Sequence, residues 1–268
     1  MGRKRTLSKA PKAGVKKKAA AKPRTRTSSA GEHGGLPFAL PQVTAAEKRR
    51  ASRLLKALEE HYPTAHCELN YKNPHELLIA TILSAQTTDA GVNKATPALF
   101  ARFPTPADYA AATPEEIEPY IRSLGFYRMK AKAVHAAMKD VVERYGNEVP
   151  RTMEELLTLR GVARKTANVV LGNAFGLNEG IPVDTHVQRL SQRFALVEEG
   201  TPVAKIEQKL MALFPREKWC AVSHMLIWHG RRACKARCPG GGIGGCADHP
   251  ICREFGVACE CRASARRG

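Results

Sequence analysis

Helix start signals recur along this 268-residue sequence, and they constrain the fold more than any other feature. A threonine followed three residues later by a glutamate can cap the first turn of a helix, because each side chain accepts a hydrogen bond from the other residue's backbone. The sequence carries this pattern at Thr44–Glu47, Thr113–Glu116 and Thr152–Glu155. Period-two alternation, the mark of a half-buried strand, is absent. We therefore predict an all-α protein of about ten helices.

Apolar periodicity indicates the individual helices. Leu54, Leu55 and Leu58 share one face of a helix that begins after Thr44, and Pro74 begins a second, strongly apolar helix. Further helical patterns cover residues 126–145, 164–175, 186–197, 203–214 and 217–232.

The charge of the chain favours a polyanionic partner. Its formal net charge is +18 at pH 7, and neutralising phosphates with such a surplus releases counterions. A basic protein of the ribosomal type, or one that is merely soluble, has the same charge and remains an alternative. No apolar run approaches the roughly 20 residues that cross a bilayer. We expect a monomer that binds nucleic acid and no membrane.

Residues 1–40 form a basic tail with 11 Lys and Arg against one acid. The tail has no aromatic residue before Phe38 and no apolar period, so it cannot bury enough surface to offset the entropy of ordering, and we predict disorder. It is either an electrostatic arm on DNA or a solvated or sorting tail. No apolar segment follows the basic N-terminus, so a signal peptide is not expected and we place the protein in the cytoplasm.

Six of the eight cysteines fall between Cys234 and Cys261. Thiols inside a cell stay reduced, so a local cysteine cluster indicates a metal site rather than disulfides. Zinc and an iron–sulfur cluster accept the same ligands, and both remain open at this point.

A short turn around Gly161 precedes a helix that begins near Arg164. The backbone N–H groups at such a helix start suit a phosphate and would position DNA without reading its sequence. Lys165 lies in the first turn of that helix, where the positive end of the helix dipole disfavours a second positive charge. This position suits an amine nucleophile. The alternative is a solvated surface lysine.

Asp184 follows an apolar segment and precedes another helical pattern. It can be the N-cap of that helix, or a carboxylate held close to Lys165. Sequence spacing does not choose between these two roles.

Several separated motifs, in one order, resemble the endonuclease III family of helix–hairpin–helix DNA glycosylases. The resemblance runs from about residue 47 to residue 253. Its motifs are Glu68–Asn70, Leu83–Gln86, Lys165–Val170 and Val183–His186.

The resemblance implies a base-excision repair enzyme that removes oxidised pyrimidines from duplex DNA and then cuts the strand. Lys165 matches the family lysine that attacks C1′ of the damaged nucleotide and forms a Schiff base, and Asp184 matches the aspartate that assists it. A relative with a purine, mismatch or mainly AP-lyase preference, or a non-catalytic DNA-binding homologue, is the alternative reading.

The resemblance also implies the DNA contacts. Gln86 matches a plugging glutamine, Phe126 takes the place of an apolar wedge, and His186 faces DNA. Ser84 and Asp89 match residues that line the base pocket. The hairpin residues that would bind the DNA backbone are Arg160, Gly161, Val162, Ala163 and Arg164.

The hairpin departs from the family at two positions. Arg160 replaces a proline, and Ala163 replaces a glycine. The alanine would strain the backbone if position 163 needs a positive φ.

By the same resemblance the ligands of a [4Fe-4S] cluster are Cys234, Cys238, Cys246 and Cys252. The last two keep the family spacing. Cys238 is shifted, and a glycine-rich insertion follows it, so Cys259 and Cys261 are spare candidates.

The family fold predicts two helical domains with the DNA cleft between them. A six-helix barrel with the hairpin would span residues 67–177. The iron–sulfur domain would combine residues 41–66 and 178–253, and residues 254–268 would form a flexible tail.

Overall fold

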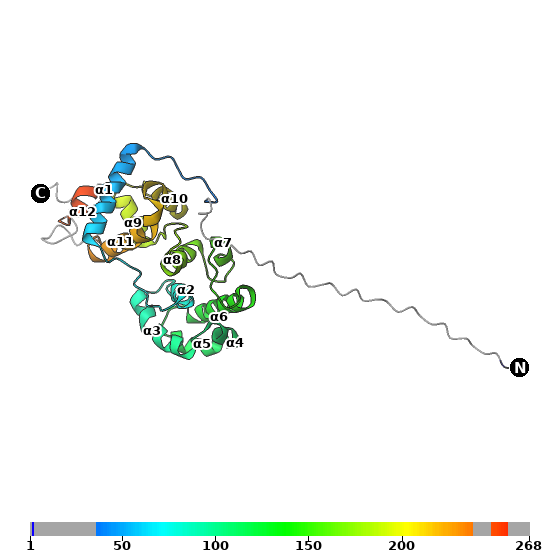
Figure 1. The fold of residues 1–268 in the computed structure, drawn as a ribbon. Coiled ribbons are helices and arrows are strands. Elements are labelled where there is room, and N and C mark those ends of the chain that lie inside the picture. The colour runs from blue at the N-terminus through cyan, green and yellow to red at the C-terminus, as the bar shows by residue number, and fades with distance from the viewer. Residues whose placement is uncertain (1, 3–35, 238–247, 257–268) are drawn as a thin grey trace. The chain divides into compact units, whose positions relative to one another are not determined.

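The computed structural model describes residues 2, 36–237 and 248–256, and this part of the chain is entirely helical (Figure 1). Residues 38–256, where described, belong to one compact unit. Its helices are α1 (Ala45–His61), α2 (Pro74–Leu83), α3 (Asp89–Arg102), α4 (Pro106–Ala111), α5 (Pro114–Ile121), α6 (Tyr127–Tyr145), α7 (Met153–Leu156), α8 (Arg164–Phe175), α9 (Thr185–Arg193), α10 (Val203–Leu213), the 3-10 turn η1 (Arg216–Lys218), α11 (Trp219–Arg232) and α12 (Pro250–Phe255).

Helices α2 to α8 pack around one apolar core. The apolar helix α2 contacts α3, α6 and α8, and α6 also packs against α4 and α5. Because α2 is buried on every side, its residues Leu77 to Leu83 are at most 8% exposed. This core therefore fixes the C-terminal end of α2, next to Ser84, and the N-terminal end of α8, which carries Lys165.

A second group of helices combines the early helix α1 with the C-terminal helices α9 to α12. Helix α1 contacts α10, α11 and α12, and α9 packs on α11. Arg50 in α1 stabilises this group, because its guanidinium donates to the carbonyl oxygens of Phe194 at 2.6 Å and Phe255 at 3.0 Å. Helix α8 contacts α11 and so joins the two groups (Figure 1). We propose that they are the two domains, divided at residues 66 and 177.

The capping signals predict the helix starts well. Thr44 caps α1 with a complete capping box, and Thr113 does the same for α5. Thr152 accepts a hydrogen bond from the N–H of Glu155 and caps α7.

Three helices lack a prediction. Helix α3 contains Gly91 and Pro97, which weaken its helical pattern, and α4 and α12 have only six residues each. Helix α12 extends to Phe255, two residues into the segment predicted as a tail. Most of the predicted basic tail, and residues 257–268, lie outside the described residues.

Among the described residues, no helix has the length and apolar character that a bilayer crossing requires.

Candidate functional site

A cavity of about 970 Å³ lies where the two helix groups meet, and it collects most of the predicted catalytic and pocket residues. A smaller cavity of about 80 Å³ shares Ser84, Asp89, Lys165 and Asp184 with it. The larger cavity is lined by His66, Glu68, Ser84, Gln86, Thr87, Thr88, Asp89, Ala90, Asn93, Lys165, Asp184, Thr185, His186 and Arg231.

Lys165 is the second residue of α8, and its side chain is exposed in this cavity. It makes no hydrogen bond or ion pair with any residue that the structure describes. The N-cap residue of α8, Ala163, supplies no side-chain acceptor. A primary amine at the open, positive end of a helix dipole is accessible to a carbon electrophile in the cavity.

The structure confirms the first of the two roles that the sequence left open for Asp184, that of a helix N-cap. Its Oδ1 accepts hydrogen bonds from the backbone N–H groups of His186 and Val187, both at 2.8 Å, and so caps α9. The same residue lines both cavities together with Lys165. The cap fixes the carboxylate on the cavity wall, where its charge can stabilise a cation.

His186 lies on the first turn of α9 and lines the same cavity as Lys165 and Asp184. Burial lowers the pKa of its imidazole, although the charge of Asp184 opposes this shift. The imidazole Nδ1 lies 3.2 Å from a guanidinium nitrogen of Arg189, which can only donate.

Two acidic residues and one arginine form an ion-pair cluster in the cavity wall. Arg231 pairs with Glu68, and its second nitrogen lies 2.8 Å from Asp89 Oδ2. Glu68 belongs to one of the motifs that carry the resemblance, but sequence reasoning assigned no role to Glu68 or to Arg231. Their pairing joins positions far apart in the chain, and nothing in the local sequence signals it.

The hairpin residues lie outside the cavity lining. Gly161 has φ +81°, and a Cβ added there would lie 3.1 Å from the Cβ of Ala133, so this position requires glycine. Ala163 has φ −93° and ψ 169°, an extended conformation that any residue adopts. The replacement of the family glycine at Ala163 therefore causes no backbone strain. Arg160 is exposed and Val162 is buried.

Arg164 is held inside the protein. Its Nε lies 3.0 Å from both carboxylate oxygens of Glu207, which is 7% exposed. Its Nη2 donates to the carbonyl of Glu179 at 3.2 Å. The ion pair connects α8 with α10, so the guanidinium has a structural role in addition to any contact with DNA.

Phe126 is 63% exposed and is the N-cap of α6, outside the cavity lining. Its backbone has φ +57°. An exposed aromatic ring on a strained backbone is unfavourable in water, and it suits a side chain that inserts into a partner.

A cysteine–histidine group near the C-terminal end of α11 offers ligands for a metal. The ligand atoms of His229, Cys234 and Cys252 lie within 4.8 Å of one another, and all three residues are buried. Hydrogen bonds from Cys252 and Arg193 lower the pKa of Cys234 to about 6, which favours the thiolate that binds metals. The predicted ligands Cys238 and Cys246 lie outside the described residues.

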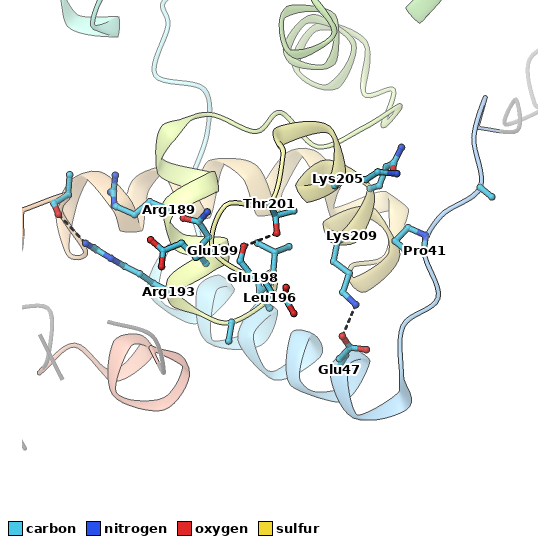
Figure 2. Close-up of a pocket in the computed structure, with 16 residues that line it drawn as sticks. Pro41, Glu47, Arg189, Arg193, Leu196, Glu198, Glu199, Thr201, Lys205 and Lys209 are labelled. Carbon is cyan, nitrogen blue, oxygen red and sulfur yellow. Dashed lines mark hydrogen bonds and ion pairs between the residues drawn. The ribbon is translucent and has the colours of Figure 1, made fainter. Parts of the chain in front are cut away.

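A second cavity of about 1050 Å³ lies between α1, α9 and α10 (Figure 2). Its cations have partners within the protein: Lys209 pairs with Glu47 at 2.6 Å, and Arg189 donates to the carbonyl oxygens of Gly230 and Cys234. Neither Lys165 nor Asp184 lines it. The candidate site is therefore the 970 Å³ cavity, which both residues line.

Comparison with known proteins gives the class first. The family model described as "HhH-GPD superfamily base excision DNA repair protein" matches residues 79–216, more than half of the chain. The matched segment includes the hairpin, Lys165 and Asp184. The chain is thus a member of this superfamily.

The relatives narrow the class. Endonuclease III of Synechocystis sp. is 52% identical over 195 residues, which cover 73% of this chain and 89% of the relative. Endonuclease III of Escherichia coli K12 is 40% identical over 205 residues, covering 76% and 95%. A solved non-covalent endonuclease III–DNA complex matches with a TM-score of 0.75 and 41% identity over 85% of this chain and all of that one. The chain belongs to the endonuclease III family.

Proposed function

We propose that this protein is a DNA glycosylase and AP lyase of base-excision repair that removes oxidised pyrimidines from duplex DNA. The observation that carries the proposal is that an exposed primary amine, Lys165, and a helix-capping carboxylate, Asp184, line the wall of one cavity. A solved relative that matches with a TM-score of 0.73, an endonuclease III–DNA covalent intermediate, supports a covalent step at this site.

The chemistry follows from these two groups. The damaged base leaves the stack at a cost of roughly a few kcal/mol, which is least for a damaged base. The Lys165 amine gives up a proton to water and bonds to C1′, and the bond from C1′ to the base breaks with its electron pair leaving on the base, which takes up a proton. The carboxylate of Asp184 stabilises the positive charge that develops on the sugar.

Strand cleavage follows from the imine. Opening of the sugar ring leaves a protonated imine between Lys165 and C1′, which acidifies the C2′ proton. Loss of that proton to a base breaks the bond from C3′ to oxygen, and the 3′ phosphate departs with the electron pair. Water then hydrolyses the imine and releases the amine.

Trapping tests this proposal directly. The protein is incubated with duplex DNA that contains one abasic site or one oxidised thymine, borohydride reduces the imine, and the modified peptide is identified by mass spectrometry. We expect a covalent complex whose modified residue is Lys165. A protein that binds the abasic duplex and forms no complex, or forms it at another residue, contradicts the proposal. A panel of duplexes with oxidised pyrimidines, oxidised purines and mismatches then separates the lesion preferences.

The hairpin and Arg160 are proposed as the contact to the DNA backbone. Gly161 and the uncapped start of α8 present backbone N–H groups, and Arg160 is exposed beside them. Replacing Arg160 with alanine is expected to lower the slope of log K against log salt by about 1, because one phosphate contact is lost. Binding titrations from low to moderate salt measure this slope. Lys139→Ala, on the far end of α6, is the matched control, and equal slopes for all three proteins would exclude the contact.

Four cysteines are proposed to hold a [4Fe-4S] cluster: Cys234, Cys238, Cys246 and Cys252. The buried thiols of Cys234 and Cys252 fit such a cluster, and Arg193, 3.0 Å from Cys234 Sγ, favours thiolate charge. The bound cluster would cross-link the C-terminal loop and take no part in the sugar chemistry.

The shifted ligand gives a separate prediction. Cys238→Ala is expected to lose the yellow-brown colour together with iron and sulfide, because four thiolates must converge on a [4Fe-4S] cluster. Cys259→Ala and Cys261→Ala are expected to keep all three. Colour, metal analysis and sulfide analysis of the purified variants decide the assignment. Loss of iron only in Cys259→Ala or Cys261→Ala would assign that cysteine as the ligand in place of Cys238. A colourless parent that contains zinc would show that the site binds zinc and not an iron–sulfur cluster.

The formal charge of +18 supports duplex DNA as the partner of this cavity. We propose a monomer that works on the bacterial nucleoid in the cytoplasm, in keeping with the bacterial sources of its relatives.

A further inference from the structure

Two of the residues that the sequence predicts to contact DNA hold their backbones in a left-handed conformation. Gln86 has φ +53° in the loop between α2 and α3, and Phe126 has φ +57° where α6 begins. Residues with a Cβ rarely adopt this region, because it is sterically unfavourable. Each loop therefore needs contacts elsewhere that hold it in place.

Lys130 connects these two loops. Its backbone N–H donates to the carbonyl of Phe126 at 3.0 Å, the first hydrogen bond of α6. Its side-chain ammonium donates to Thr87 Oγ1 at 2.6 Å, and Thr87 directly follows Gln86. One residue thus contacts both the backbone of Phe126 and the neighbour of Gln86.

The position of Lys130 is unfavourable for a lysine on other grounds. The residue is 5% exposed, and no carboxylate pairs with it among the described residues. It also lies in the first turn of α6, where the helix dipole opposes a positive charge. Burial lowers the pKa of its amine. An apolar side chain would fill the same space without this penalty, so core stability does not account for a lysine here.

We infer that Lys130 is a positioning residue that locks the Gln86–Thr87 loop to the start of α6, so that Gln86 and Phe126 meet the DNA as one preformed unit. This inference rests on the proposed function. The resemblance implies that Gln86 fills the space that the base leaves and that Phe126 acts as a wedge beside it, so both loops act in the same event. If the two loops move independently, each loses conformational entropy when DNA binds, and this loss weakens binding.

Thr87 offers a matched pair of variants. Thr87→Val removes the hydroxyl at nearly equal volume, and Thr87→Ser retains it. We expect Thr87→Val to slow single-turnover release of an oxidised thymine from duplex DNA by about tenfold, the loss expected for a hydrogen bond to a charged group. Thr87→Ser should restore the parental rate. Lys130→Met should resemble Thr87→Val, the double variant should be no slower than either, and the exposed Lys132→Met is the charge control.

Two further readouts separate this inference from simple misfolding and from the proposed function. Melting temperatures show whether each variant folds like the parent. Affinity for a duplex with a stable abasic analogue, divided by affinity for undamaged duplex, needs no chemistry and should fall in Thr87→Val but not in Thr87→Ser. Equal rates and equal affinity ratios for these two variants overturn the inference even if the parent forms the trapped complex. A parent that never traps DNA overturns the lyase proposal, and the affinity ratio still decides the role of Lys130.

Discussion

Replacing Lys165 with alanine is expected to abolish borohydride trapping and to reduce strand cleavage at abasic sites to the level seen without protein. No other amine lines the cavity in the described part of the chain, so no side chain there replaces the nucleophile. Because Lys165 is exposed and makes no hydrogen bond or ion pair with the described residues, the variant should fold normally. The variant should still bind an abasic duplex, because the other residues that line the cavity are unchanged.

Single-turnover cleavage, trapping and a binding titration on one abasic duplex measure these three effects. Lys94→Ala is the matched control, since Lys94 is an exposed lysine of α3 that does not line the cavity. We expect this control to trap and cleave like the parent. Residual trapping by Lys165→Ala would show that a second amine reaches C1′, and an unchanged cleavage rate would remove Lys165 from the mechanism.

The sequence predicts what is local in this fold. Capping residues and helical periodicity depend on neighbours within one turn, so Thr44, Thr113 and Thr152 locate helix starts correctly. Helix α3 escapes prediction because Gly91 and Pro97 interrupt its pattern, while packing against α2 and α5 stabilises it. Tertiary contacts outweigh propensity there.

The candidate site likewise has one part that the sequence predicts, its residues, and one part that it does not, their contacts. Motif positions identify Ser84, Asp89, Lys165, Asp184 and His186, and the structure places all five on one cavity. Which contact each charged group makes depends on residues distant in the sequence.

Arg164 illustrates this limit. Its hairpin position predicts a DNA contact, but Glu207 in α10 holds its guanidinium, and no local pattern signals that pair. The ion pair of Arg231 with Glu68, and the hydrogen bond of Lys130 to Thr87, likewise join distant segments. Sequence therefore predicts the chemistry of this site better than its electrostatics.

Asp184 caps α9, and we propose a chemical role for the same carboxylate; two substitutions separate these roles. Asparagine keeps an oxygen that can accept from the N–H groups of His186 and Val187, and it is as good an N-cap as aspartate. Asp184→Asn should therefore melt close to the parent. Without the negative charge that stabilises the sugar cation, its rate of base release should fall by roughly 10²- to 10⁴-fold.

Asp184→Ala should lose the same activity and also about 1 kcal/mol of folding free energy, because α9 loses its cap. Thr44→Ala, which removes the cap of α1, is the matched control and should lose similar stability with little change in rate. Thermal melts and single-turnover base release on one duplex measure both quantities for all three variants. If Asp184→Asn releases the base as fast as the parent, the carboxylate serves only as a cap, and the cation must be stabilised by another group in the cavity. If Asp184→Asn is as unstable as Asp184→Ala, the loss of rate reflects a displaced α9, and the chemical role of the charge is contradicted.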